Sequence, residues 1–430
     1  MIRAKLAELA PTRSFRVGVA LALVIGHLVA FTIAGHERLG VGFNAAPGHA
    51  PYYSDPKARE LMPSPRQPHY WTRLIVSRWD SEHYIGFAER QLYACPRHGT
   101  GQQLMQCGLA WMPTMGLIAG NVAHLIGAPS DYTLVAFSVI AAFLINLMWT
   151  SRILVSRLGI GSAYGALFAF NLFSSSFYLV TPYNEAWTFA LMLAAFLCVT
   201  KAQWFRAAAL IGAATALRPA AAGIVFGFGC TVLYAVWQAR KAGEKRWWLP
   251  LASLPLATWG QLVMMGLFWI SIGDPKAYVH AQVAFAYPDG GLHFHRFIEP
   301  LWYFKSLSMQ HIDGVAILGS IGIIALMAKD VAAKLPRVEM IFLSVVSAAM
   351  AFLPLSADTQ YWGLNRYMLM CPLIFIAAGE LAVRRRAVYV LWLLLGAFLY
   401  WHIEMCSYIA HGDPHICPCL GKVEFTMPIS

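Results

Sequence analysis

The chain has 430 residues, of which 58% are hydrophobic and 12% charged, and its formal net charge at pH 7 is +11. The charged fraction is about half of that usual in soluble domains, which excludes an ordinary soluble protein. A basic soluble chain would suggest nucleic acid binding, but here Lys and Arg lie in short segments between apolar runs. That pattern is a signal of membrane topology, and no nucleic acid partner is expected.

Several apolar runs are long enough to cross the roughly 30 Å hydrocarbon core of a membrane. The first run is too long for a signal peptide and lacks a small-residue cleavage site, so we expect a retained membrane helix. The chain is therefore expected to be an all-α, multi-pass membrane protein with roughly 9 to 11 membrane helices. The clearest runs are residues 17–34, 132–150, 160–180, 249–272, 338–354, 366–382 and 387–403.

The basic segments predict which parts of the chain share a side of the membrane. Cytoplasmic loops retain Lys and Arg, so an even number of crossings should separate each consecutive pair of basic segments. Three apolar runs lie between Arg16 and Arg152, so one of them does not cross. Residues 109–127, interrupted by Pro113, are expected to be re-entrant or interfacial on the outer side. The basic segments are residues 3–16, 152–157, 201–206, 240–246, 329–337 and 384–386.

This topology divides the chain into one membrane domain, residues 1–403, and an external tail, residues 404–430. Residues 35–130 are expected to form a large first external loop that carries interfacial helices, and residues 273–313 a second external loop. The apolar run 207–237 lies between two basic segments, so it should enter and return as two short helices that meet at "ALRPAAAG".

Five of the eight cysteines fall in the parts expected to be external, where disulfides are permitted. Five thiols cannot all pair within one chain, and spacing does not give the connectivity. A bond between Cys95 and Cys107 is one candidate, since it would close a short loop. Three cysteines lie in apolar runs, where a buried thiol is ordinary packing: Cys198, Cys230 and Cys371. The external ones are Cys95, Cys107, Cys406, Cys417 and Cys419.

The stretch "SRWDSEHYIGFAERQLY", residues 77–93, predicts an amphipathic helix in the membrane interface. Asp80 precedes the first turn of this helix and can cap it. Alternatively, a carboxylate fixed beside Trp79 at the boundary of water and membrane can accept a proton from an attacking hydroxyl. The two roles are compatible, because a capping residue is rigid and catalysis requires a fixed group. The apolar positions at helical spacing are Tyr84, Ile85, Ala88 and Leu92.

In order and spacing, the segments "RWDSEHY", "WMPTMGLI", "TPYNEAWTF", "ALRPAAAG" and "NRYMLMCPLIF" resemble the PIG-V family of GPI mannosyltransferase 2-like enzymes and their prokaryotic relatives. The resemblance runs from about residue 71 to residue 380, and the block at residues 79–84 is its most specific part. It implies a GT-C fold, an active site facing the lumen or periplasm, and a polyprenyl-phosphate sugar as donor, typically mannose. It also implies that Trp79 and Asp80 lie at the catalytic centre.

The chain departs from this family pattern in two places. Arg218 is followed by Pro219 and Ala220 where relatives tend to have an Arg-Ser-Asn type segment, and residues 404–430 match nothing in the family. These departures leave the sugar and the acceptor open.

Two charged residues lie within apolar surroundings. Glu185 falls in the first turn of a helix expected to run to residue 199, where it would offset the helix dipole. The resemblance favours a role for Glu185 as a second acidic residue of the site, which orients a sugar hydroxyl or acts as general base together with Asp80. Arg218 is expected at mid-membrane depth, where a charge is costly, so it should face an acid or a polar cavity. It either forms an ion pair between helices or contacts the donor phosphate and stabilises its departing charge.

The remaining candidates are less specific. Arg366 would serve the same phosphate or anchor its helix at the interface, and Tyr183, Tyr361 and Trp362 would stack on sugars or belong to the aromatic belt. His293 and His295 are weak evidence for a metal and are expected to face solvent. The tail motif "HGDPHICPC" looks more like a ligand set, but a disulfide or a simple tail is favoured over a metal site, and a divalent metal is not favoured. The other candidate substrate-binding residues are Ser81, His83 and Tyr84.

The sequence thus favours an inverting glycosyltransferase that moves a sugar from a polyprenyl-phosphate donor to a lipid-linked or glycan acceptor, with membrane lipids as its other partners and no further cofactor. The alternative is a non-enzymatic transporter or lipid-binding scaffold in which Arg218 marks a substrate path. Transporters often carry paired helix interruptions, and only one is evident here. The excess of Arg, 22 against 10 Lys, favours a bacterial inner membrane over the endoplasmic reticulum.

Overall fold

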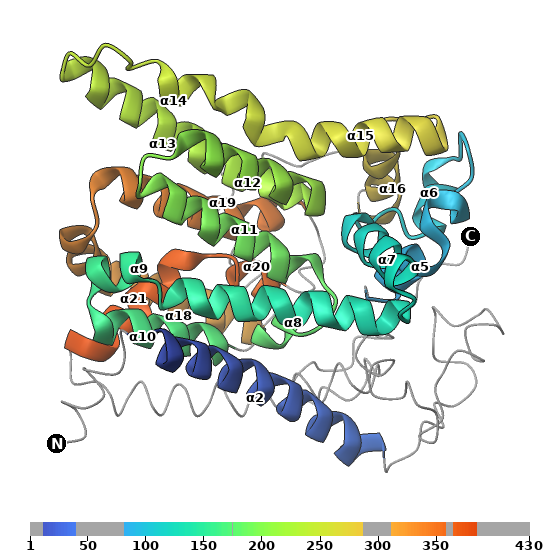
Figure 1. Ribbon diagram of the computed structural model, residues 1–430, viewed down its shortest axis with the longest axis horizontal. Helices are drawn as coiled ribbons and strands as arrows, with labels where there is room; N and C mark the ends of the chain where they lie inside the picture. Colours follow the sequence, from blue (N-terminus) through green and yellow to red (C-terminus); the bar gives the residue numbers. More distant parts are fainter. Residues whose placement is uncertain (1–11, 40–80, 174, 287–310, 358–363, 385–430) are drawn as a thin grey trace.

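The computed structural model describes residues 12–39, 81–173, 175–286, 311–357 and 364–384, and in these residues the chain is helical without a strand (Figure 1). The predicted all-α class is confirmed. Several residues that the sequence singles out lie outside the described residues: Trp79, Asp80, His293, His295, Tyr361, Trp362 and the tail from residue 404.

Most helices run roughly alongside one another in one bundle (Figure 1). Its members are α2 (Arg13–Leu39), α8 (Ser130–Trp149), α10 (Ile160–Asn171), α11 (Asn184–Val199), α12 (Trp204–Leu217), α13 (Ala222–Lys241), α18 (His311–Lys334), α19 (Arg337–Ala357) and α21 (Pro372–Arg384).

Aromatic side chains fill the centre of this bundle. The ring of Phe170 stacks on Phe189 at 4.7 Å between centroids and meets Phe375 edge to face at 5.0 Å. Trp149, fully buried, lies 6.0 Å from the Phe170 ring. Such pairs contribute beyond their buried area, so α8, α10, α11 and α21 are held by one shared cluster.

Glycines allow α10 and α21 to approach closely. A Cβ atom on Gly165 would lie 2.9 Å from the Cα atom of Gly379, closer than real Cβ contacts come. Small residues at such crossings are characteristic of helix packing in membranes, where close backbone contact replaces the hydrophobic driving force. A larger residue at either position would force the two helices apart.

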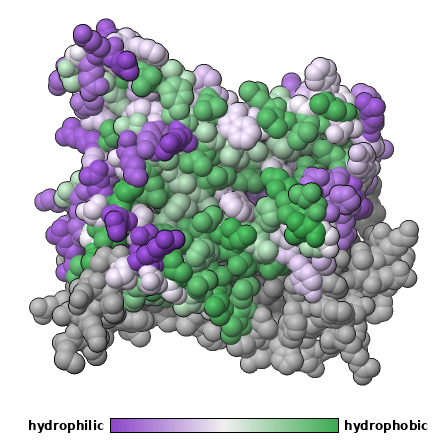
Figure 2. All heavy atoms as spheres, in the orientation of Figure 1, coloured by the Kyte–Doolittle hydropathy of each residue, from purple (hydrophilic) through white to green (hydrophobic). Residues whose placement is uncertain are grey.

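Among the described residues, four helical segments are long and apolar enough to cross a membrane: Arg13–Ala30, Ser130–Trp149, Pro219–Lys241 and Leu249–Ile272. The last consists of α14 (Leu249–Ala252), a 3-10 turn η4 (Leu254–Thr258) and α15 (Trp259–Ile272). Helix α9 (Arg152–Leu158) and α10 are bent by 113° and would form a fifth span if they are taken together. Figure 2 shows apolar side chains over the middle of the bundle and polar ones toward its ends.

Two predicted helices are broken. The run 160–180 is not one helix, because α10 ends at Asn171 and a 3-10 turn η2 (Ser176–Leu179) follows. Here the Ser176 hydroxyl donates to the Asn171 carbonyl at 2.7 Å, a local bond that competes with the helical pattern. The run 366–382 is divided into α20 (Leu364–Met368) and α21.

The predicted break in the run 207–237 is present, although one of its two helices is longer than expected. Helix α12 ends at Leu217, a short 3-10 turn η3 (Pro219–Ala221) follows, and α13 continues for 20 residues. Pro219 explains the break, since proline lacks the N–H that the helix needs and disfavours a helical conformation for the preceding residue.

A group of short helices covers one end of the bundle, at the right of Figure 1. Helix α7, within the run predicted to be re-entrant or interfacial, has only 13 residues and packs on α5. The two helices touch at Gly116 and Gly120, where any Cβ atom would collide with the carbonyl oxygens of Tyr84 and Ala88. The group comprises α5 (Ser81–Arg90), η1 (Gln91–Ala94), α6 (Gly101–Gln106), α7 (Thr114–Ile126) and α16 (Ala277–Ala286).

The opposite end of the bundle gathers basic segments that the sequence predicts on one side. Arg16 at the start of α2 donates to the Leu147 carbonyl at 3.2 Å, and Arg157 pairs with Glu339 at 3.0 Å. The basic segments near residues 16, 157 and 337 therefore meet at one end, as the predicted topology requires.

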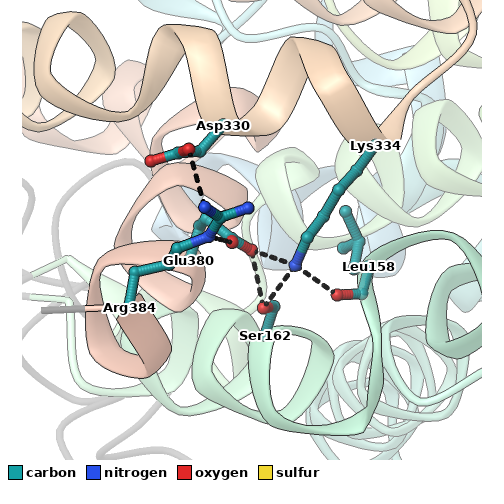
Figure 3. Close-up of polar contacts among 6 residues, drawn as sticks. All are labelled: Leu158, Ser162, Asp330, Lys334, Glu380 and Arg384. Carbon is teal, nitrogen blue, oxygen red and sulfur yellow. Dashed lines mark hydrogen bonds and ion pairs between the residues drawn. The ribbon is translucent and has the colours of Figure 1, made fainter. Parts of the chain in front are cut away.

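A buried ionic network joins three helices at this end (Figure 3). Glu380, 1% exposed, accepts hydrogen bonds from Lys334 Nζ at 2.5 Å, Ser162 Oγ at 2.7 Å and Arg384 Nε at 3.0 Å. Arg384 also pairs with Asp330 at 3.1 Å. The charges of the two cations and two anions cancel. We therefore interpret this network as a structural connection between α10, α18 and α21.

Replacing Glu380 by Gln is expected to destabilise the protein strongly. Removing one partner of a buried ion pair leaves uncompensated charge and costs about 3 to 5 kcal/mol. The measurement is the apparent melting temperature of the purified protein in detergent. The control is Asp274→Asn, which removes the more exposed pair between Asp274 and His280 and should cost at most about 1 kcal/mol. Equal melting temperatures for the two variants would contradict the assignment.

Candidate functional site

The two charged residues that the sequence places in apolar surroundings form an ion pair. Glu185 lies in the first turn of α11 and is 1% exposed, and its Oε1 pairs with a terminal guanidinium nitrogen of Arg218. Arg218 follows the last residue of α12 in an extended conformation, with φ −150° and ψ 139°, which the following proline favours. The break in the helix therefore places the guanidinium beside the beginning of α11.

A second arginine and a tyrosine complete this group. Arg366 of α20 lies with its Nε 3.4 Å from Glu185 Oε1. The Tyr367 ring has its centroid 4.5 Å from Arg218 Cζ and 5.7 Å from Arg366 Cζ, within the range of cation–π contacts. We call Glu185, Arg218, Arg366 and Tyr367 the arginine cluster. Its planar guanidinium groups suit anions that accept two parallel hydrogen bonds, such as carboxylates and phosphates.

Asn184 links this cluster to the short helices that cover the bundle. Its side-chain nitrogen lies 3.2 Å from the Tyr84 hydroxyl, 3.1 Å from the Met112 carbonyl and 2.7 Å from the Leu217 carbonyl. These acceptors belong to α5, to the segment before α7 and to the end of α12. One buried amide thus fixes three separate segments around the first residue of α11.

Three tyrosines lie beside Asn184. The Tyr183 ring is 4.8 Å from Tyr178 and 6.2 Å from Tyr84, edge to face in both pairs. Tyr183 is 2% exposed. The alternative that Tyr183 belongs to an aromatic belt facing the membrane boundary is therefore wrong, because the ring is covered by protein.

Within the described residues, helix α5 covers Ser81–Arg90, in the stretch that the sequence predicts to be an amphipathic helix. Ser81 is fully buried, and the His83 ring stacks on Trp111 with 3.7 Å between centroids. Gly108, with φ +92°, lies close to the His83 side chain, and a Cβ atom at Gly108 would come within 2.9 Å of His83 Nδ1. The imidazole is therefore packed against both an indole and a glycine.

The candidate disulfide between Cys95 and Cys107 is present, with 5.2 Å between the Cα atoms. It joins the end of η1 to the end of α6 and so closes a loop between α5 and α7. The three cysteines expected in apolar runs are free: Cys198, Cys230 and Cys371.

Sequence reasoning overlooked Asn184, Trp111 and Tyr367. Each lies in one of the five segments of the resemblance, and Asn184 and Tyr367 are neighbours of singled-out charged residues. In the sequence alone, a neutral side chain of this kind does not indicate a functional role. Asn, for example, is an ordinary residue at the start of a helix. In the part of the chain that the structure describes, no group of three or more His, Cys, Asp or Glu side chains is placed to hold a metal ion.

Comparisons with known proteins add no relative. No family model matches the chain, and neither a curated protein nor a solved structure matches it.

Proposed function

We propose that the protein is a membrane glycosyltransferase of the PIG-V type, with a GT-C-like bundle of roughly 9 to 11 membrane helices. It transfers a sugar, most consistently mannose, from a polyprenyl-phosphate donor to a lipid-linked or glycan acceptor on the lumenal or periplasmic face. A bacterial inner membrane is the proposed location, since Arg exceeds Lys, 22 to 10.

One observation carries this proposal: all five segments of the resemblance contribute to one place. "TPYNEAWTF" supplies Asn184 and Glu185, and "ALRPAAAG" supplies Arg218. "NRYMLMCPLIF" supplies Arg366. "RWDSEHY" and "WMPTMGLI" reach the same place through the hydrogen bonds of Asn184 to Tyr84 and to the Met112 carbonyl. Segments that merely shared membrane-protein composition would have no reason to meet.

The proposed reaction is a single displacement. The acceptor hydroxyl oxygen attacks the anomeric carbon, the bond from that carbon to the phosphate oxygen breaks, and polyprenyl phosphate leaves with the electron pair. Asp80 takes the proton of the acceptor hydroxyl as general base. Inversion at the anomeric carbon follows from the single displacement.

The arginine cluster suits the leaving phosphate. Negative charge develops on the phosphate oxygen as the bond breaks, and fixed cations in a buried site stabilise it without reorganisation. Glu185 orients the Arg218 guanidinium through their ion pair and is also placed to accept a hydrogen bond from a sugar hydroxyl. Asn184 Oδ1 is buried without a hydrogen-bond partner among the described residues, so it offers another acceptor to such a hydroxyl.

The test is a donor screen with purified protein, using mannose, glucose and arabinose polyprenyl phosphates and a membrane extract as acceptor source. Transfer from one donor, with release of polyprenyl phosphate, supports the proposal. Absence of transfer from every donor, together with flux of a labelled solute into proteoliposomes, would establish the transporter alternative instead.

Asn184→Ala is expected to lower the turnover number by about tenfold or more, because Tyr84 and α5 lose their connection to the arginine cluster. The matched control is Asn171→Ala, which removes another buried amide, bonded to Asn146 at 2.9 Å and to His27 at 3.1 Å, away from the site. Each loss should cost about 1 to 3 kcal/mol of stability. Equal turnover per folded molecule in the two variants would show that Asn184 is only structural.

A further inference from the structure

The turn between α13 and α14 carries a dense group of basic residues. Four cations and one carboxylate, Glu244, lie between residues 240 and 246, which gives a formal charge of 4 − 1 = +3. We call residues 237–248 the basic corner. All four cations are exposed: Arg240, Lys241, Lys245 and Arg246.

Three other basic residues at the same end of the bundle are paired with carboxylates. Arg157 pairs with Glu339, Lys334 with Glu380, and Arg384 with Asp330. Among the described residues, no ion pair involves a cation of the basic corner. Its positive charge is therefore available to an external partner, whereas the charge of the other three is balanced within the protein.

Two of these cations lie on indole rings instead. Arg240 Cζ is 5.8 Å from the Trp247 ring centroid, and Lys241 Nζ is 5.6 Å from that of Trp237. A cation–π contact orients a cation without neutralising it. Both indoles are exposed, Trp237 at 54% and Trp247 at 37%, and the neighbouring Trp248 is 50% exposed. The surface thus combines unneutralised cations with exposed aromatic rings.

The position of the corner is that of a membrane boundary. It joins two segments apolar and long enough to cross a membrane, Pro219–Lys241 and Leu249–Ile272. In Figure 1 the turn projects at the upper left, and Figure 2 shows polar side chains there beside an apolar surface. Tryptophan is favoured at this depth, where its ring meets the acyl chains and its N–H meets the headgroups.

We propose that the basic corner binds the headgroups of anionic phospholipids. The phosphate and the additional negative charge of such lipids contact Arg240, Lys241, Lys245 and Arg246, while the exposed indoles insert at the acyl boundary. A cluster of basic residues directly beside a membrane helix attracts anionic lipid in this way. A soluble acidic partner would explain the positive charge of the basic corner. It would not explain why exposed indole rings lie there, at the end of two apolar segments.

The experiment uses the full-length protein in bilayers of phosphatidylcholine that contain a small fraction of photoactivatable phosphatidylglycerol. After illumination, the labelled peptides are mapped by mass spectrometry. We expect labelling within residues 237–248 that exceeds the labelling by photoactivatable phosphatidylcholine. The variant R240Q/K241Q should weaken labelling by about fivefold for each cation removed.

The matched control is K201Q/R206Q, which removes two exposed cations that lie outside the basic corner. It should leave labelling of the basic corner unchanged, as should the charge-conserving variant R240K/K241R. Coincident elution of all variants on size exclusion establishes that each is folded. Equal labelling by both lipids, equal loss in the control variant, or displacement by millimolar inorganic phosphate would overturn the proposal.

Discussion

Arg218→Gln is expected to lower sugar transfer by about 100- to 1,000-fold, because the leaving phosphate loses a fixed cation. Glu185→Gln should have a comparable effect, since it releases the Arg218 guanidinium from its orientation. Each single change also breaks a buried ion pair, which costs up to about 3 to 5 kcal/mol. The stability loss of Arg218→Gln should be the smaller, because Arg366 Nε remains 3.4 Å from Glu185.

The double variant Glu185→Gln, Arg218→Gln separates a structural role from a functional one. Two groups in contact are coupled, so the double variant should be more stable than the sum of the single losses predicts. If the pair serves only to join α11 to the end of α12, transfer should recover together with stability. Our account predicts recovery of stability alone, with transfer remaining as low as in the single variants.

Both quantities are measured on the same preparations. Apparent melting temperature in detergent reports stability, and transfer is expressed per folded molecule after size exclusion. The control is Glu380→Gln, whose pair with Lys334 lies at the other end of the bundle. It should lower the melting temperature without lowering transfer per folded molecule. Wild-type transfer by the double variant would show that the Glu185–Arg218 pair has only a structural role.

Local sequence predicted the elements around the site well. The helical spacing of apolar residues predicts a helix where α5 lies, and Pro219 predicts the end of α12 at Leu217. That Arg218 needs an acidic or polar partner follows from the cost of a charge at its depth. These predictions succeed because each depends on residues within one or two helical turns.

The partners of these residues could not be predicted. Glu185 and Arg366 are far apart in the chain, and only the tertiary fold brings Arg366 Nε to 3.4 Å from Glu185 Oε1. The bonds of Glu380 to Lys334 and Ser162 have the same origin, as each residue alone resembles an ordinary polar residue near a helix end. The apolar composition of residues 160–180 predicts one helix, and this prediction is wrong. Composition does not show that the Ser176 hydroxyl bonds to the Asn171 carbonyl and so competes with the helical hydrogen bonds.

Asp80 is the residue on which the proposed reaction depends most. A general base contributes typically 100- to 10,000-fold to the rate, so Asp80→Asn should lower transfer within that range. Asparagine caps a helix about as well as aspartate, so α5 should persist and the melting temperature should not change. The substitution therefore removes the base and preserves the cap.

The most direct test of the glycosyltransferase assignment is thus the rate of sugar transfer from polyprenyl-phosphate mannose by purified wild type and Asp80→Asn. Asp274→Asn serves as the control, because Asp274 is a carboxylate that pairs with His280 outside the arginine cluster. We predict transfer by the wild type and by Asp274→Asn, and loss of at least 100-fold in Asp80→Asn at unchanged melting temperature. Transfer by Asp80→Asn at the wild-type rate would contradict the account.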